Sequence, residues 1–214
     1  MSNEIFVVGG GSSLQGFPFG QLKDRDTIAV NVAAFDVPNP TYCITGDSSI
    51  FRRVQEGYFK DIDTTWVMLI TPNHPVIKFK DGQFQHKLSR FVYNPFSVNM
   101  LIKYTKCEGI GFSFKDFRTG FNSGFCAFQL AVLLGYKKIH LLGFDLNLNP
   151  TKCHYHNKYQ EGKKKISNAD LNRYFDNFKL AFETIKKETD IEVISCSKNS
   201  RLNKLIPYIP FGEL

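Results

Sequence analysis

The stretch Ile5-Phe6-Val7-Val8-Gly9-Gly10-Gly11-Ser12-Ser13 begins with four apolar residues and continues through three glycines into two serines. A short apolar run of this kind is typical of a strand buried on both faces, as in a parallel sheet. The glycines predict a tight turn in which the backbone can approach a ligand closely. We therefore expect residues 9–13 to follow the first strand of an α/β sheet, with amides able to hold phosphate or ribose oxygens. An ordinary tight turn would explain the same residues.

Further strands and helices alternate after this turn. We expect strands at residues 27–31, 41–45, 65–70, 138–145 and 191–195, and helices at 48–59, 123–134, 168–187 and 200–205. This alternation predicts a single Rossmann-like α/β domain over residues 1–214, with a mostly parallel sheet and helices on both faces.

Residues 78–116 do not fit the alternation. They contain Gly82, Pro95 and several aromatic residues without a helical period. We expect an irregular insertion, which would act either as a lid that closes over the site or as a fixed second core.

Composition limits the class of protein. Hydrophobic residues at 43% and charged residues at 22% are typical of a folded soluble chain, and the net charge of +7 favours an anionic partner. Five cysteines without a CxxC pair argue against a disulfide framework and a structural zinc site. No apolar stretch reaches the length of a membrane span, and no signal peptide is evident. We expect a cytoplasmic protein without a membrane span, and the composition leaves a homo-oligomer open.

Polar residues end three of the expected strands, namely Asn31, Asp47 and Asp145. Ligands of open α/β sheets bind beyond the carboxyl ends of the strands, so these side chains are candidates for a site. Asn and Asp also favour turns for local reasons. Asn122-Ser123-Gly124 begins an apolar helix, where Ser123 would either cap the helix or bind an anion together with the free amides.

Two histidines lie in the polar stretch Cys153-His154-Tyr155-His156. In an extended segment His154 and His156 point the same way. They could bind a metal, although no nearby Glu or Cys completes a set, so the metal site stays unknown. Alternatively, one of them serves as a general base, or both are solvated loop residues.

Several of these motifs, in this order, resemble a known group of enzymes. The resemblance rests on residues 9–14, Phe19-Gly20-Gln21-Leu22, residues 28–31, residues 122–124, residues 133–145 and residues 191–205. The sequence is similar here to the bacterial CMP-sialic-acid-dependent sialyltransferases and their relatives, which include archaeal pterin pyrophosphokinases and many phage- or prophage-encoded proteins. The resemblance covers roughly two-thirds of the chain and leaves residues 78–116 unmatched.

The resemblance implies a set of ligand-binding residues. It places Gly9, Gly10, Gly11, Ser12, Ser13, Asn31, Asn122, Ser123 and Gly124 around a nucleotide, with Gly143 and Asp145 at the edge of the same pocket. It also implies a general base in the loop after residue 145, for which His156 is the first candidate and His154 the second. Asp47 stands near a position where the sialyltransferases have Asn, and a carboxylate there could hold a metal ion.

We therefore expect a glycosyltransferase that uses a nucleotide-activated sugar, with a CMP-sugar as donor and no required cofactor. The acceptor would be a glycan, a lipid-linked saccharide or a modified nucleic acid. One alternative is a diphosphate-transferring kinase of the pterin pyrophosphokinase type, with Mg²⁺ held by Asp47 or Asp145. Another is a nucleotide-binding protein without catalytic activity.

Overall fold

The computed structural model describes residues 3–70, 100–147, 154–156 and 166–214. Between residues 70 and 100 it also describes the backbone of three short strands. These strands are β5 (Val76–Lys80), β6 (Gln83–His86) and β7 (Val92–Tyr93), which pair as a small antiparallel sheet. Everything stated below concerns this described part of the chain.

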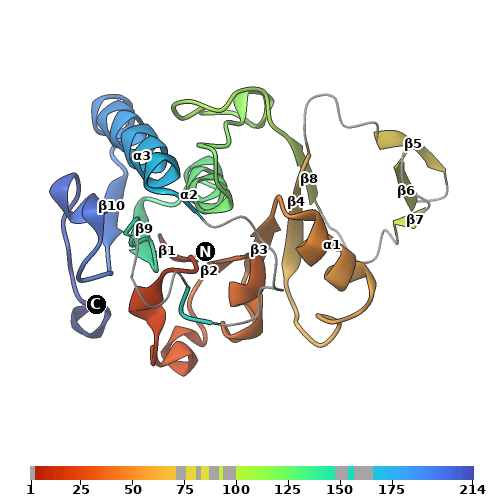
Figure 1. Cartoon of the computed structure of the whole chain (residues 1–214), viewed down its shortest axis with the longest axis horizontal. Helices are drawn as coiled ribbons and strands as arrows, with labels where there is room; N and C mark the ends of the chain where they lie inside the picture. Colours follow the sequence, from red (N-terminus) through yellow and green to blue (C-terminus); the bar gives the residue numbers. More distant parts are fainter. Residues whose placement is uncertain are drawn as a thin grey trace.

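A seven-stranded sheet in the order β10-β9-β1-β2-β3-β4-β8 forms the centre of the protein, and all of its pairings are parallel (Figure 1). The strands are β1 (Glu4–Val8), β2 (Thr27–Val30), β3 (Tyr42–Thr45), β4 (Thr65–Ile70), β8 (Met100–Lys103), β9 (Lys138–Leu142) and β10 (Glu192–Ser195). In the register, Val7 lies between Ile28 of β2 and Leu141 of β9. The Rossmann-like α/β fold expected from the sequence is confirmed.

The sheet separates two hydrophobic cores because successive side chains of a strand point to opposite faces. In β1, Ile5 and Val7 belong to the larger core, whereas Phe6 and Val8 belong to the smaller one. Helices α2 (Ser123–Leu133) and α3 (Asn168–Glu188) cover the larger core (Figure 1). Helix α1 (Ser48–Gln55) and the short helical turns η1 (Ser12–Leu14), η2 (Phe19–Leu22) and η3 (Asn31–Phe35) cover the smaller core.

Helix α2 is the innermost helix of the protein. Its residues from Phe125 to Val132 are all buried, which explains why its sequence is apolar on every side. Phe125, Phe128 and Phe178 pack edge-on or tilted with ring centroids 5.1–5.9 Å apart. Full burial of one such side chain stabilises the fold by about 1.5–3 kcal/mol.

Some expected elements end earlier than the sequence suggested. The predicted strands 27–31 and 138–145 stop at Val30 and Leu142, because Asn31 and Gly143 adopt left-handed backbone angles with φ of 54° and 71°. The predicted helix 48–59 stops at Gln55, and the predicted helix 200–205 is the 3₁₀ turn η6 (Arg201–Lys204). None of the described helices combines the length and the apolar character that crossing a membrane requires.

The expected insertion at residues 78–116 has a different boundary. Met100–Lys103 forms edge strand β8 of the main sheet, so the irregular part ends before it. Four residues at a sheet edge are too few to reveal a period in the sequence. Of residues 78–99 only the backbone of β5, β6 and β7 is described, so the lid remains a prediction for that part.

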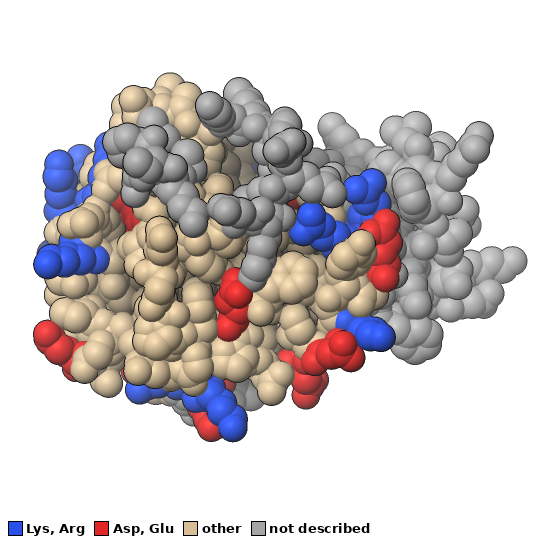
Figure 2. All heavy atoms as spheres, turned by 60° about the horizontal axis from the view of Figure 1, so that its bottom comes forward, with Lys and Arg blue, Asp and Glu red and all other residues tan. Residues whose placement is uncertain are grey.

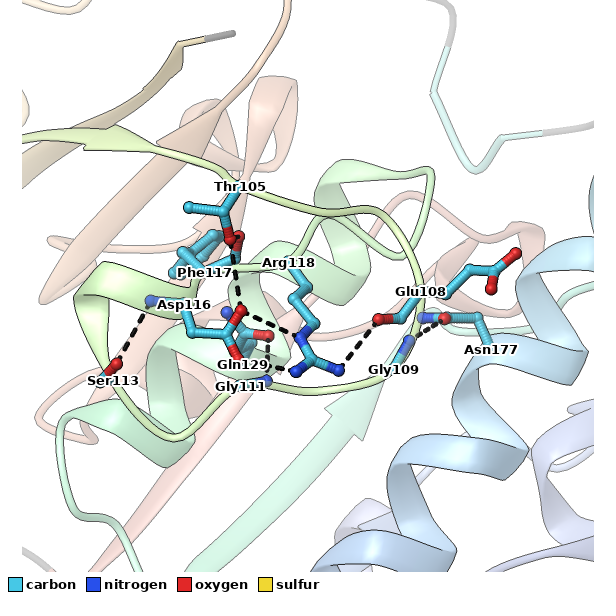
Figure 3. A network of polar contacts seen from close by, with 10 residues as sticks. All are labelled: Thr105, Glu108, Gly109, Gly111, Ser113, Asp116, Phe117, Arg118, Gln129 and Asn177. Carbon is cyan, nitrogen blue, oxygen red and sulfur yellow. Dashed lines mark hydrogen bonds and ion pairs between the residues drawn. The ribbon is translucent and has the colours of Figure 1, made fainter. Parts of the chain in front are cut away.

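The segment after β8 is fastened to both helices of the larger core (Figure 3). The backbone N–H of Gly109 donates to Asn177 of α3 at 2.7 Å, and that of Gly111 donates to Gln129 of α2 at 3.1 Å. Both amide side chains are buried. Arg118 Nη2 lies 2.7 Å from Asp116 Oδ2 on the outer side. These contacts favour a fixed arrangement for residues 109–118.

The described cysteines are free thiols, in agreement with the absence of a disulfide pattern. Burial raises the pKa of Cys43 and of Cys196 to about 12 in each case, and it also raises that of Cys126. Thiols of this kind are poor nucleophiles. Cys153 lies outside the described residues.

A buried histidine in β9 makes the stability of the fold depend on pH. His140 is fully buried, its ring stacks on Phe6 at 4.4 Å, and its Nε2 lies 3.1 Å from Glu4 Oε2. Burial lowers the pKa of His140, and the contact with Glu4 opposes that shift only in part. The unfolded chain therefore binds the proton more readily than the folded chain does.

We predict that the free energy of unfolding falls as the pH is lowered from 7.5 through the ordinary imidazole pKa of about 6.5. In this range the unfolded state gains a proton at His140 that the folded state does not. His140→Phe keeps a planar ring beside Phe6 and removes the titration, so the decrease between pH 7.5 and 5.5 should be smaller in that variant. Urea unfolding at both pH values measures it, and equal decreases in the two proteins would contradict the prediction.

Candidate functional site

The glycine turn after β1 is packed directly against the end of β9. The backbone N–H groups of Gly9 and Gly11 donate to the carbonyl oxygens of Leu142 and Gly143, at 2.7 and 2.9 Å. A Cβ atom on Gly9 would lie 2.8 Å from the Gly143 oxygen, and one on Gly11 only 2.6 Å from it. The protein's own packing thus requires both glycines, and their amides are not free to hold phosphate as the sequence analysis expected.

Asp145 fixes the rest of this turn. Its carboxylate, 8% exposed, accepts from the backbone N–H of Ser13 at 2.8 Å, from Ser13 Oγ at 2.5 Å and from Ser12 Oγ at 3.3 Å. Ser13 Oγ also lies 3.1 Å from Ser197 Oγ, which accepts from the Gly143 N–H at 2.9 Å. Asp145 was expected at the edge of a ligand pocket, but the structure engages both of its oxygens in holding the turn.

Phe144 brings the turn and the start of α2 together. A Cβ atom on Gly9 would lie 3.3 Å from one edge atom of the Phe144 ring, and one on Gly124 would lie 3.0 Å from another. Gly46, at the end of β3, is also near this point, since its Cβ would lie 3.7 Å from Ser123 Oγ. The structure therefore places the Gly9 turn, the end of β3 and the first turn of α2 at the carboxyl edge of the sheet, as expected.

The first turn of α2 is capped by Asn122 and not by Ser123. Asn122 Oδ1 accepts from the Phe125 N–H at 2.8 Å, and Asn122 Nδ2 donates to the Gly120 oxygen at 2.9 Å. This cap leaves the amides of Ser123 and Gly124 as the first two of the helix, where the helix dipole favours an anion.

The other two predicted strand-end residues also serve the protein's own structure. Asn31 Oδ1 accepts from Thr45 Oγ1 at 2.8 Å, which links the ends of β2 and β3. Asp47 caps α1, because its Oδ1 accepts from the Ser49 N–H at 2.9 Å and from Ser49 Oγ at 2.7 Å. Both residues lie at the expected edge, but these contacts by themselves do not indicate a ligand.

The histidine segment lies over the middle of the glycine turn. His154 Nδ1 is 3.2 Å from the Gly10 carbonyl oxygen, and the rings of His154 and His156 are parallel with centroids 5.5 Å apart. A Cβ atom on Gly10 would lie 3.1 Å from His154 Nδ1 and 3.9 Å from His156 Nε2. The structure thus brings together two motifs that are far apart in the sequence.

Three of the five non-glycine residues that have positive φ angles in the described part of the chain lie at the same edge, whereas Asp24 and Asn39 precede β2 and β3. Asn31, Phe121 and Leu146 have positive φ angles of 54°, 66° and 51°, and they follow β2, precede α2 and follow β9. Such conformations are costly for residues with large side chains and tend to occur at functional sites. Within the described residues, no group of three or more His, Cys, Asp or Glu side chains could hold a metal ion.

The net positive charge is not concentrated in one patch on the face seen in Figure 2. Its Lys and Arg side chains lie toward the margin of the described surface, and the centre consists mostly of uncharged residues.

Comparison with solved structures identifies the fold. The sialyltransferase CST-II in complex with a trisaccharide acceptor and CMP superposes with a TM-score of 0.59 at 18% identity, over 99% of this chain and 88% of that one. CstII from Campylobacter jejuni with cytidine-5'-monophosphate gives 0.56 at 18% identity, over 97% and 85% of the two chains. The fold is that of the CstII sialyltransferases. No family model matches the chain, and no curated protein matches its sequence.

The sequence analysis did not single out three residues that build this edge, namely Thr45, Phe144 and Ser197. Thr45 and Ser197 are common residue types whose roles arise only from contacts across the sheet. Phe144 could have been noticed, because an aromatic residue between Gly143 and Asp145 at a strand end must pack against neighbouring loops.

We predict that Gly11→Ala destabilises the fold by about 1–3 kcal/mol, because its methyl group would meet Asp145 Cγ and the Gly143 oxygen at 2.6 Å. Gly10→Ala is the matched control. The nearest atoms to its methyl group would be those of the His154 and His156 rings, at 3.1 Å or more, so the cost should stay below about 1 kcal/mol. Urea unfolding of both variants measures the difference, and equal midpoints would contradict this account of the turn.

Proposed function

We propose that the protein is a glycosyltransferase that moves a sugar from a CMP-activated donor to an acceptor hydroxyl. The observation that carries the proposal is the histidine pair over Gly10, in the turn that Phe144 packs together with the start of α2, in a fold that matches a sialyltransferase solved with CMP along nearly the whole chain. The donor's nucleotide would lie at the carboxyl edge of the sheet, the usual ligand position in open α/β folds.

The first turn of α2 is suited to the phosphate of the donor. The amides of Ser123 and Gly124 begin the helix, and the absent side chain of Gly124 lets the Phe144 ring pack against this turn. An anion at this point gains from the helix dipole and from hydrogen bonds to free amides. Asn122, Gly143, Asp145 and the other residues of the Gly9 turn would act indirectly, by fixing the walls of the pocket.

The base would be one of the two histidines. Because a carbonyl oxygen only accepts, the contact between His154 Nδ1 and the Gly10 oxygen requires the proton on Nδ1. The lone pair of a neutral His154 is then on Nε2, where it can take a proton. His156, the first candidate from the sequence, stacks beside it.

The chemical step follows from this arrangement. The imidazole takes the proton of the acceptor hydroxyl as the acceptor oxygen bonds to the anomeric carbon. The bond between that carbon and the phosphate oxygen breaks, and CMP leaves with the electron pair, stabilised by the amides of α2. The acceptor remains one of a glycan, a lipid-linked saccharide and a modified nucleic acid, which a screen of acceptors would distinguish.

We do not propose the magnesium-dependent kinase. Its two candidate ligands have other partners, since Asp145 holds the Gly9 turn and Asp47 caps α1. A nucleotide-binding protein without turnover is the outcome that the experiments below would reveal if no acceptor reacts.

We predict that CMP stabilises the protein, by about 2.7 kcal/mol at one hundred times its dissociation constant. Ser123→Val should weaken this effect, because its branched side chain would crowd the phosphate position at the start of α2. Thr184→Val, on the exposed side of α3, is the matched control and should bind CMP as the original protein does. Thermal shift with CMP, UMP and GDP measures binding, and no shift with CMP would rule out the donor.

We also predict that replacing the base lowers turnover by roughly 10²- to 10⁴-fold without a comparable loss of CMP affinity. His154→Ala and His156→Ala identify which imidazole is responsible, and the geometry at Gly10 favours the larger effect at His154. The rate of the original protein should fall as the pH is lowered and the base becomes protonated. Full activity in both variants would remove the histidines from the mechanism and leave nucleotide binding unaffected.

A further inference from the structure

Tyr155 lies between the two histidines in the chain, and its hydroxyl reaches a different element of the protein. Its hydroxyl donates to Asp36 Oδ2 at 2.9 Å, and its backbone N–H donates to the Gly10 oxygen at 3.3 Å. The Gly10 oxygen is also the partner of His154 Nδ1. Neighbouring residues of one short segment thus share this acceptor, so a contact that holds Tyr155 also restrains the histidines on either side.

The ring of Tyr155 also has fixed neighbours. Its centroid lies 5.3 Å from that of Phe19, and the ring packs against the smaller core. It also meets the His156 ring edge-on, with centroids 4.7 Å apart. Tyr155 therefore links the orientation of the His156 ring to the smaller core.

Asp36 is itself part of a rigid segment. It follows η3, its backbone N–H donates to the Ala33 oxygen at 3.0 Å, and the adjacent Val37 is buried in the smaller core. Ala33 is completely buried as well. Asp36 therefore gives the tyrosine hydroxyl a fixed partner on a different element from the one that carries the histidines.

We propose that Tyr155 and Asp36 form a positioning pair that sets the histidine rings over the glycine turn. This inference rests on the proposed function in one respect, namely that one of these rings is the base. Catalytic groups have to be held to within about 0.5 Å of the productive geometry, and a displacement of about 1 Å can lower a rate by 10²-fold. Tyr155 touches neither donor nor acceptor in this account and acts only through the histidines.

The chain offers a matched control for this pair. Tyr136 donates from its hydroxyl to Asp26 Oδ2 at 3.1 Å, with the same chemistry, but it follows α2 and its partner directly precedes β2. This second pair therefore lies at the amino edge of the sheet. Tyr155→Phe and Tyr136→Phe remove the same atom, so any difference between them reports position in the fold and not the loss of a hydroxyl.

The test compares these variants in the full chain by kinetics and by the ¹⁵N signals of the histidine rings, which report the tautomer. We expect Tyr155→Phe and Asp36→Ala to lower kcat roughly 10- to 100-fold with little change in KM for the CMP-sugar. In both variants the ¹⁵N signals of the histidine rings should no longer show the Nδ1–H tautomer of His154. The variants His154→Ala and His156→Ala assign these signals to the two rings. Asp36→Asn keeps an acceptor oxygen and should restore most of the rate, and the double variant should be no worse than either single one. Tyr136→Phe should change neither readout.

The outcomes separate this inference from the proposed function. If no CMP-sugar is turned over, the proposed function fails, and the ring signals still decide whether Tyr155 sets the histidines. If turnover is present but Tyr155→Phe retains both its kcat and the ring signals of the original protein, the positioning pair is overturned alone. A Tyr136→Phe variant that loses as much kcat as Tyr155→Phe would also overturn it, since the effect would then be general destabilisation.

Discussion

The carboxylate of Asp145 connects the two strands on which the candidate site is built. It follows β9 and accepts hydrogen bonds from Ser12 and Ser13 in the turn after β1. A nearly buried carboxylate is stable only when its oxygens are satisfied, so the turn and the strand end depend on each other. The histidine contacts at Gly10 presuppose that this turn has one conformation.

The two hydrophobic cores hold the segments that form the carboxyl edge of the sheet. Helix α2 is buried along its length, and its start is fixed by Phe144, Asn122 and the end of β3. On the other face, η3 presents Asp36 to the segment that carries the histidines. The carboxyl edge is therefore assembled from both sides of the sheet.

Most of the fold could be predicted from the sequence because its strands are short apolar runs that end at glycine or polar residues. The strand beginning at Met100 was missed, since a four-residue edge strand has little pattern. The candidate site was predicted less well than the fold. The structure brings the Gly9 turn, Asn122-Ser123-Gly124 and the histidines to one edge of the sheet, but the sequence does not show which atoms are already bonded within the protein. Asp145 and Asp47 illustrate this, because a carboxylate that binds a ligand and one that caps a turn look the same in a sequence.

The strand order has a consequence for how the chain reaches this structure. Central strand β1 pairs with β9, so that Ile5 lies opposite Ile139, and all strands of the large sheet are parallel. Contacts between residues so distant in the chain require a large loop to close before they contribute any stability, which slows folding. During synthesis, β1 remains without one of its two neighbours until β9 has left the ribosome. We expect truncated chains that end before β9 to expose an apolar strand edge and to aggregate.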